Sequence, residues 1–240
     1  MIVGRGRVGR SIAAAAASAE LEPVLRAGDD LEGLAGRAVL LCVPDQAIAS
    51  VAAGIGAAGS PPSLIGHTSG ATGLEALEAA GAEQSFSLHP LQTIPDGETD
   101  LAGCPAAVAA TAPATLEAVT DLATTLGMTP FRVAEADRAT YHAAASIASN
   151  FLVTVEQTAA ELLDGIGIDR PREVLAPLVR RSLENWLERG PAALTGPIAR
   201  GDEVTVGAHR EALRDHPELL DLYDGLAART RELAATGSPR

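Results

Sequence analysis

Lysine is missing from this 240-residue chain, so all 18 of its cationic side chains are arginine. This excludes any mechanism that uses a lysine as acid, base or Schiff-base nucleophile. Aromatic residues make up only 2% of the chain, so alanine and the aliphatic residues must build the core. Such a core favours helices packed closely on a small sheet. The two cysteines, Cys42 and Cys104, cannot form a disulfide framework, which indicates a reducing, cytoplasmic compartment.

Positive charge is also scarce, because the formal net charge is -13. No basic stripe is present to neutralise phosphates, which argues against nucleic acid as a partner and leaves a small molecule. No run reaches the roughly 20 apolar residues of a membrane span. Residues 1–19 superficially resemble a signal peptide, but a strand, a glycine turn and a helix explain them better.

The first half of the chain alternates strand-like and helical segments, which predicts an α/β fold with a mostly parallel, doubly wound sheet. The expected strands are 1–3, 23–26, 38–43, 63–67, 85–88, 106–110 and 130–133, and the expected helices are 9–19, 45–53, 74–80 and 114–126.

Beyond residue 134 the strand signals stop, and we expect only helices. A long helix over 138–163 should end at Gly165 and Gly167, and Asp169 should cap the next helix, which has Pro171 in its first turn and ends at Gly190. A loop over 195–202 precedes helices near 203–214 and 217–235. The sequence therefore predicts two domains, residues 1–134 and residues 135–240.

Gly4-Arg5-Gly6-Arg7-Val8-Gly9 matches the G-x-G-x-x-G pattern of dinucleotide-binding turns. The first glycine permits the tight turn, the second lets a pyrophosphate approach the backbone, and the third lets helix and strand pack closely. The pyrophosphate then lies at a helix N-terminus, which favours an anion. The preceding strand and following helix make this pattern specific for a nicotinamide dinucleotide.

Arginines near the turn favour NADP over NAD. Arg26 ends the second strand beside Arg5 and Arg7, and such cations suit a 2′-phosphate. Asp29 and Asp30, about 20 residues after the turn, are the evidence for NAD, whose ribose prefers an acid there. We interpret Asp30 as the cap of a short helix and keep NAD as the weaker alternative.

Three more strands end in candidate site residues at the same predicted sheet edge, where ligands bind in such folds. Val43 and Pro44 should flank the cofactor. His67-Thr68-Ser69-Gly70 and His89-Pro90-Leu91-Gln92-Thr93 follow the next two strands, and Ser69 is expected to contact the cofactor. A lone histidine is more often a structural residue than a catalyst, so a purely structural role stays open for the histidine of either cluster.

These motifs, together with Leu194-Thr195-Gly196-Pro197-Ile198-Ala199-Arg200-Gly201-Asp202, resemble oxidoreductases that join a Rossmann-like domain to a C-terminal helical domain of unknown function. The resemblance covers nearly the whole chain. That family is similar to pyrroline-5-carboxylate reductase, the β-hydroxyacid dehydrogenases, ketopantoate reductases and deazaflavin-dependent NADP oxidoreductases. It implies an NAD(P)-dependent reductase, often a homodimer, with substrate held between the domains, and ketopantoate as the first substrate to try.

The catalytic lysine of the dehydrogenases and classical ketopantoate reductases has no counterpart here. Instead His142, Ser146 and Asn150 share one face of the expected long helix. Such a polar face on an alanine-rich helix is equally consistent with ordinary hydrogen bonds between helices. We expect hydride transfer between NADPH and the C=O or C=N of a small acid, with His142 or His89 as the acid and Ser146 and Asn150 orienting the substrate.

Arg200 is expected to bind the substrate carboxylate, either in its own subunit or across a dimer, with Thr195 in the same motif. Tyr141 is interpreted as a packing residue, and the five histidines show no metal-ligand spacing. Two alternatives stay open at this point. One is a non-catalytic NADP-binding sensor or scaffold, and the other is a deazaflavin-dependent NADP oxidoreductase.

Overall fold

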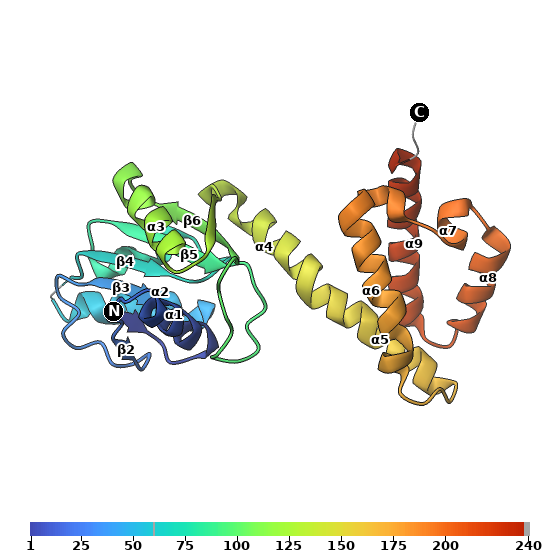
Figure 1. The fold of residues 1–240 in the computed structure, drawn as a ribbon, viewed down its shortest axis with the longest axis horizontal. Coiled ribbons are helices and arrows are strands. Elements are labelled where there is room, and N and C mark those ends of the chain that lie inside the picture. Colours follow the sequence, from blue (N-terminus) through green and yellow to red (C-terminus); the bar gives the residue numbers. More distant parts are fainter. Residues whose placement is uncertain (60, 238–240) are drawn as a thin grey trace. The chain divides into compact units, whose positions relative to one another are not determined.

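The computed structural model describes residues 1–59 and 61–237, which form two compact units, Met1–Leu152 and Val153–Arg240 (Figure 1). The first unit contains one seven-stranded sheet in the order β2-β1-β3-β4-β5-β6-β7. Its strands are β1 Ile2–Val3, β2 Leu25–Arg26, β3 Ala38–Leu41, β4 Leu64–His67, β5 Ser85–Pro90, β6 Pro105–Ala110 and β7 Thr129–Arg132.

The neighbouring strands are parallel except for β5 and β6, which run antiparallel with Leu88 opposite Val108. The expected mostly parallel, Rossmann-like sheet is therefore confirmed, and each expected strand is present within a few residues. The antiparallel pair was not predicted. It forms because the 91–104 connection contains no helix to return the chain to the other end of the sheet, and the absence of an expected helix between these two strands was the available signal.

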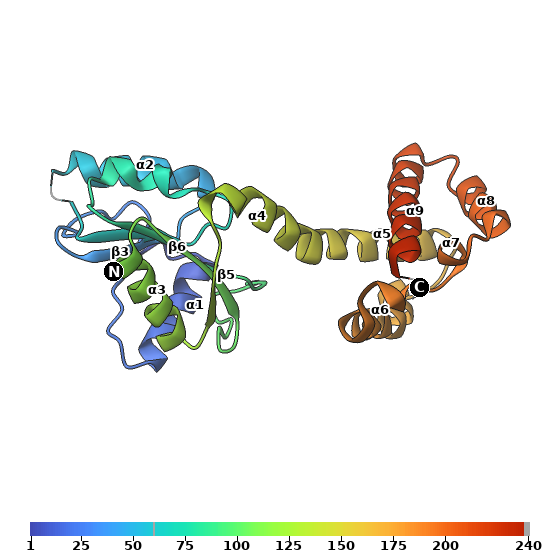
Figure 2. The same cartoon turned by 90° about the horizontal axis from the view of Figure 1, so that it is seen from above.

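Helices cover both faces of this sheet, α2 (Ile48–Ala57) on one and α1 (Arg7–Ser18) and α3 (Pro113–Thr125) on the other (Figure 2). Successive strand residues face opposite sides, as the period of a strand requires. Leu40 thus packs with Ile12 of α1, whereas Leu41 packs with Ile48 at the start of α2. The two resulting apolar layers fix the strands whose carboxyl ends form the candidate site.

The long helix after the sheet is interrupted. It consists of α4 (Arg138–Ser146), a π-helical segment (Ile147–Phe151) and α5 (Leu152–Gly165). The sequence predicted one helix over this range but not the π segment, a feature that is frequent at functional sites. The predicted boundary after residue 134 stays a prediction: the last strand ends at Arg132, whereas the compact units divide at Leu152.

The second unit is helical, with α6 (Pro171–Arg189), α7 (Pro197–Arg200), α8 (Glu203–Ala212) and α9 (Pro217–Gly237). Pro171 begins α6 and Gly190 ends it, as predicted. The predicted Asp169 cap is wrong: the capping position is Arg170, in the left-handed region at φ 52° and without a capping side chain. The expected loop over 195–202 contains the short α7, and Asp202 caps α8 by accepting from the Thr205 N–H at 3.1 Å.

Candidate active site

A cavity of about 540 Å³ lies at the carboxyl ends of β1, β3, β4 and β5. The glycine turn forms one side of it and two histidine side chains form another. Its lining residues are Gly6, Arg7, Val8, Cys42, Val43, Pro44, Asp45, Thr68, Ser69, Gly70, His89, Pro90, Gln92, Ile94 and His142. Val43, Pro44 and Ser69 thus lie where the sequence placed them, beside the turn.

Two of the three motif glycines are required by the protein's own packing. Gly4 has φ +122°, and a Cβ there would lie 2.3 Å from the Cys42 carbonyl oxygen. A Cβ on Gly9 would lie 1.9 Å from the Gly4 carbonyl oxygen, so this glycine lets α1 approach β1. These are the roles that the pattern predicts for the first and third positions.

Gly6 differs, because nothing in the protein's packing requires a glycine there. Its φ of -68° is ordinary, and a Cβ would lie 4.0 Å from the Cys42 carbonyl oxygen. Gly6 is also the capping residue of α1 and has no side chain that could accept a hydrogen bond from the first N–H groups of that helix. The turn therefore leaves open space in front of a helix N-terminus, as a bound pyrophosphate needs.

The three arginines near the turn differ in their surroundings. Arg7 lines the cavity, and Arg5 is exposed outside its lining. Arg26 forms an ion pair with Asp30, its Nη1 lying 2.8 Å from Oδ1, while its buried Nε has no hydrogen-bond partner among the described residues. Asp30 therefore does not cap a helix, and that prediction is wrong: the side chain holds Arg26 instead.

The cluster after β4 is largely structural. His67 is fully buried, its Nδ1 accepts from the Ser69 N–H at 3.2 Å, and burial lowers its pKa to about 4. The Ser69 hydroxyl accepts from the N–H groups of Ala71 and Thr72, so it is already used to shape the turn. Ser69 lines the cavity but offers it no unoccupied hydroxyl donor, because that proton goes to the Thr72 hydroxyl at 2.9 Å.

His89, at the end of β5, is paired with Tyr141 of α4. The distance between His89 Nδ1 and the Tyr141 hydroxyl oxygen is 2.6 Å. Burial lowers the pKa of His89 to about 4, with a further contribution from the neighbouring His142, so the ring is neutral near pH 7. Burial also raises the pKa of Tyr141 to about 12. Tyr141 is therefore more than the packing residue that the sequence suggested.

Gly70 lies between the two candidate acids. A Cβ there would be 2.9 Å from His142 Cδ2 and equally close to His89 Cε1 and Nε2. The two imidazole rings are 6.3 Å apart between centroids, inclined at 72°. Glycine at this position thus lets both histidines approach the same space, and any side chain would displace them.

A second cavity, of about 550 Å³, shares His89, Gln92 and His142 with the first. Ser146 and Asn150 line it together with His142, as their common helix face predicted, even though Asn150 lies in the π segment. Alanines form much of the remaining wall. The second cavity, which contains the candidate catalytic side chains, therefore adjoins the first cavity, which contains the glycine turn.

A buried arginine that the sequence did not single out joins these elements. Arg138 is 4% exposed and donates to the Ser87 hydroxyl at 2.8 Å, to the Ser69 carbonyl and to Glu135. Burial alone would raise the pKa of Glu135, but hydrogen bonds from Arg138 and the Leu74 N–H hold it below its ordinary value. The spacing of Glu135 and Arg138 on one helical turn was the available signal for this pair.

The two predicted substrate-binding residues belong to the second unit. Arg200 ends α7, and Thr195 precedes that helix. Their part in a substrate site stays a prediction.

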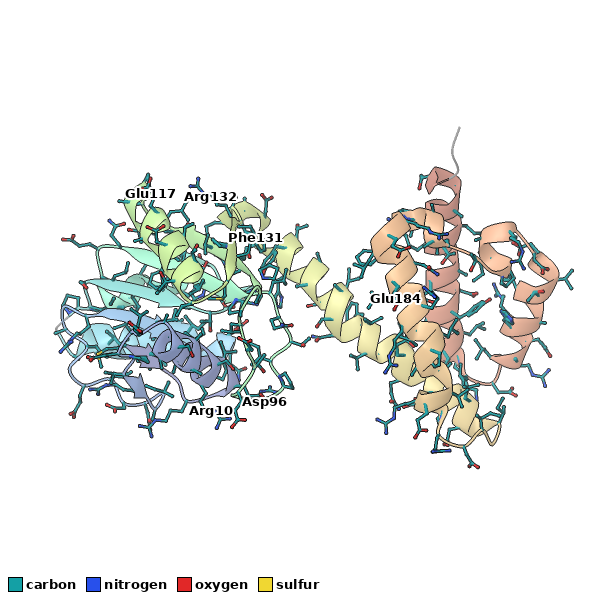
Figure 3. The ribbon with its side chains drawn as sticks, in the orientation of Figure 1. Arg10, Asp96, Glu117, Phe131, Arg132 and Glu184 are labelled. Carbon is teal, nitrogen blue, oxygen red and sulfur yellow. The ribbon has the colours of Figure 1, made fainter. Side chains whose placement is uncertain are left out.

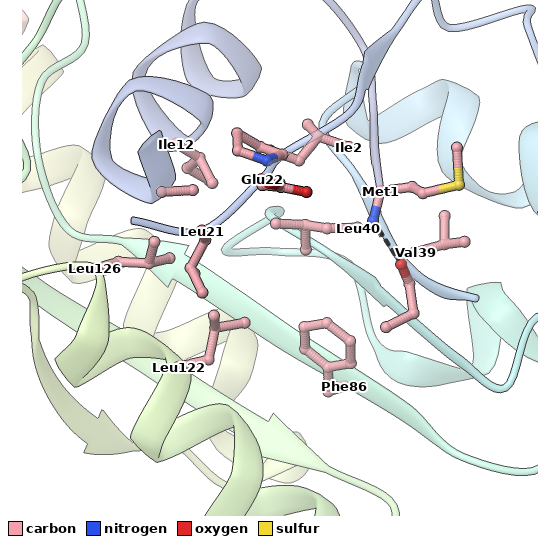
Figure 4. Close-up of a pocket in the computed structure, with 13 residues that line it drawn as sticks. Met1, Ile2, Ile12, Leu21, Glu22, Val39, Leu40, Phe86, Leu122 and Leu126 are labelled. Atoms are coloured by element: carbon pink, nitrogen blue, oxygen red, sulfur yellow. Dashed lines mark hydrogen bonds between the residues drawn. The ribbon is translucent and has the colours of Figure 1, made fainter. Parts of the chain in front are cut away.

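A different cavity, of about 240 Å³, lies at the opposite end of the strands, near the amino ends of β1 and β3 (Figure 4). Its walls are apolar apart from Glu22 and the amino group of Met1, which donates to the Ala38 carbonyl at 2.7 Å. Within residues 1–59 and 61–237, no three His, Cys, Asp or Glu side chains are grouped to hold a metal ion. No helix in that same part of the chain is long and apolar enough to cross a membrane.

The fold and the glycine turn define a Rossmann-like protein with a helical C-terminal region. The chain belongs to the family described as a domain of unknown function, DUF2520, whose model matches residues 104–230. This confirms the resemblance that the motifs indicated. No curated protein matches the chain by sequence.

Solved structures share the fold across nearly the full length. A candidate NADP oxidoreductase from Bacteroides fragilis is 23% identical with a TM-score of 0.80, covering 96% of each chain. A Thermotoga maritima protein whose name states no function is 23% identical with a TM-score of 0.77, covering 98% of each. Pyrroline carboxylate reductase from Plasmodium falciparum, solved with NADP bound, is 13% identical with a TM-score of 0.59, covering 97% of each.

Proposed function

We propose that this chain is an NADP-dependent oxidoreductase that transfers a hydride between NADPH and the C=O or C=N group of a small acid. The observation that supports this most is the cavity that extends from Gly6 of the glycine turn to His89 and His142. It joins a surface suited to a pyrophosphate with two side chains suited to proton transfer. The similarity in fold to an NADP-bound reductase supports the same conclusion.

The residues present fit the dinucleotide. Gly6 leaves room for the pyrophosphate at the N-terminus of α1, and Val43 and Pro44 flank the cavity beyond it. Arg26 lies at the end of β2 and takes the 2′-phosphate, with Arg5 and Arg7 nearby in the turn. NADPH, when bound, supplies the hydride.

The chain's own side chains handle the substrate and its proton. His89 or His142 donates the proton to the substrate oxygen or nitrogen, and Ser146 and Asn150 orient that atom. We assign the substrate carboxylate to Arg200, supported by Thr195, either in the same subunit or across a dimer, because an arginine can bind a carboxylate through two hydrogen bonds. A 2-keto acid such as ketopantoate is the first candidate substrate.

We further infer that the enzyme is a cytoplasmic homodimer that associates through its helical unit. Large apolar side chains are exposed on α6, among them Leu178 (65% exposed), Trp186 (58%) and Leu187 (69%). An apolar surface of this kind is typical of an interface. Cys42 and Cys104 are free thiols, as expected in a reducing compartment.

A titration with NADPH and with NADH, followed by nicotinamide fluorescence and thermal shift, tests the cofactor assignment. Ligand at about 100 times Kd should stabilise the protein by about 2.7 kcal/mol. Gly6→Ala should weaken NADPH binding at least tenfold, because its methyl group enters the space for the pyrophosphate. Gly207→Ala in α8 is the matched control, since a Cβ there meets nothing within 4 Å.

Absence of binding by both nucleotides, or an unchanged affinity in Gly6→Ala, would overturn the proposal. Once binding is established, oxidation of NADPH in the presence of 2-keto acids and imino acids tests the reaction. Tight binding without turnover by any of these, or by a deazaflavin, would instead support a non-catalytic sensor. Turnover confined to the deazaflavin would support a deazaflavin-dependent NADP oxidoreductase.

A further inference from the structure

Building on the proposed function, we infer that Tyr141 and His89 act as a pair. Tyr141 holds His89 in the tautomer that carries its proton on Nε2, and that N–H is the proton donor to the substrate. His89 is then the catalytic residue and Tyr141 a positioning residue that acts through it. This assignment selects between the two histidines that the site offers.

The geometry of the pair is the first support. The Tyr141 hydroxyl and His89 Nδ1 are 2.6 Å apart, and the two rings meet edge to face with centroids 5.6 Å apart. Phe131 of β7, labelled in Figure 3, packs against the Tyr141 ring at a centroid distance of 5.9 Å. The tyrosine is therefore held between β7 and the histidine.

The direction of this hydrogen bond decides the tautomer. A phenol O–H is far more acidic than the N–H of a neutral imidazole, so the hydroxyl is the better donor and the bare nitrogen the better acceptor. With Nδ1 accepting, a neutral ring must carry its proton on Nε2. That atom lies against Gly70, whose missing side chain keeps the space beside it open.

The surroundings keep His89 uncharged. Its ring is largely removed from water, and the titratable and charged groups near it are His142, Asp45, Arg138, His67 and Tyr141. Burial together with His142, Arg138 and His67 outweighs the opposing effect of Asp45, so the pKa falls to about 4. The donor at neutral pH is therefore a neutral imidazole rather than an imidazolium, an arrangement that enzymes use to polarise carbonyl groups.

The proton balance is complete within the pair and solvent. As hydride reaches the substrate carbon, the π electrons of its C=O move to oxygen, and that oxygen takes the proton of His89 Nε2. The Tyr141 proton moves to Nδ1, which leaves the imidazole neutral, and the phenolate then takes up one H+ from bulk solvent, so that the overall reaction consumes one proton. Tyr141 is only half-buried, so solvent can reach it. The substrate is reduced to the alcohol and NADPH is oxidised to NADP+.

Nitrogen-15 NMR of the histidine rings tests the pair without any substrate. The chain has five histidines, so the His89 signals can be assigned with a His89→Gln variant. We expect wild-type His89 to show an unprotonated Nδ1 and a protonated Nε2. Tyr141→Phe should produce a mixture of tautomers and raise the His89 pKa, because the donor that favours the neutral ring is lost.

A second histidine–tyrosine pair in the chain provides the matched control. His209 Nδ1 lies 2.9 Å from the Tyr223 hydroxyl in the helical unit, with ring centroids 5.8 Å apart. Tyr223→Phe should leave the His89 signals unchanged. A proton on Nδ1 of wild-type His89, or a tautomer unaffected by Tyr141→Phe, would overturn the inference. The wild-type spectrum is decisive even if the variant fails to fold.

When a substrate is known, Tyr141→Phe should lower kcat at least tenfold while the Kd for NADPH stays unchanged, since a general acid contributes about 10²–10⁴ to the rate. An unchanged kcat in Tyr141→Phe would contradict the inference about the Tyr141–His89 pair and leave the proposed function standing. Failure of NADPH to bind the wild-type protein would contradict the proposed function, so the two failures are distinguishable.

Discussion

The sheet unit and the helical unit bury their apolar residues to very different extents. Strands and helices of the first unit enclose two apolar layers, with side chains such as Leu41 and Ile48 wholly buried. In the helical unit, the buried apolar residues of the described range are Ala160, Val206, Leu213 and Ala227. Two of these four residues are alanines, while larger apolar side chains such as Trp186 stay exposed.

This difference indicates that the two units are stabilised in different ways. The first unit has its own core, so the glycine turn and the histidines are held by packing that is already complete. The helical unit leaves much of its apolar surface exposed, and burying that surface against a second copy would contribute roughly 25 cal/mol per Å². Changes to the first unit should therefore affect folding and cofactor binding, and changes to the second should affect association.

The largest effect is expected at the closest approach in the first unit. Gly9→Ala should destabilise folding by about 4 kcal/mol or more, because its Cβ would lie 1.9 Å from the Gly4 carbonyl oxygen and α1 would have to move. Gly165→Ala in the helical unit, where a Cβ meets nothing within 4 Å, should change stability little. Denaturant unfolding measures both, and equal effects would contradict the comparison.

Lowering the pH should reduce the folding stability of the first unit through its buried histidines. His67 has a folded pKa of about 4 against an ordinary 6.5, so its contribution is complete above pH 6.5 and is lost as the pH falls through 4. The loss is about 3 kcal/mol at about 1.4 kcal/mol for each pKa unit. His67→Asn, whose Oδ1 can replace Nδ1 as acceptor for the Ser69 N–H, should remove the contribution of His67 to this pH dependence and leave that of His89. A variant that loses stability as steeply as the wild type between pH 6.5 and 4 would refute the assignment.

The helical unit should respond to charge on its exposed apolar face. Trp186→Asp should weaken homodimer association at least thirtyfold, since tryptophans at interfaces often contribute 2 kcal/mol or more. Val24→Asp in the sheet unit, at a residue 49% exposed, is the control and should not change association. Sedimentation equilibrium measures both. A monomeric wild type, or a variant that dimerises normally, would contradict the proposed interface.

A further effect within the first unit concerns cofactor choice. Arg26→Ala should weaken NADPH about 10- to 150-fold and leave NADH nearly unchanged, because a charge-assisted contact is worth about 1.5–3 kcal/mol. Asp30→Asn should strengthen NADPH binding slightly by freeing Arg26 from its ion pair. Arg231→Ala, which breaks the Arg231–Glu203 pair of the helical unit, is the control. Equal losses for NADPH and NADH in Arg26→Ala would contradict the 2′-phosphate assignment.

Features set by neighbouring residues could be predicted from the sequence, and features set by distant partners could not. The glycine turn was found because strand, turn and helix are contiguous. The Tyr141–His89 pair joins residues 52 positions apart, so no local pattern revealed it. The spacing of His142, Ser146 and Asn150 suits a regular helix, and it gave no sign of the π segment.

The same limit explains the two errors at loop residues. Aspartate is a residue type that often caps helices, which is why Asp30 and Asp169 were predicted as caps. Asp169 lies just before α6, whereas the segment between β2 and β3 that contains Asp30 forms no helix. Asp30 instead pairs with Arg26, a contact that depends on how the loop after β2 folds back. Composition and residue spacing do not determine the conformation of such a loop.

Hydrogen–deuterium exchange with and without NADPH is the most direct test of the dinucleotide site, because it locates the ligand on the chain. We expect protection in the first unit, in the glycine turn at residues 4–9 and in the segments 43–45 and 67–70. Protection absent from these three segments, or confined to the helical unit, would contradict a dinucleotide site at this edge of the sheet.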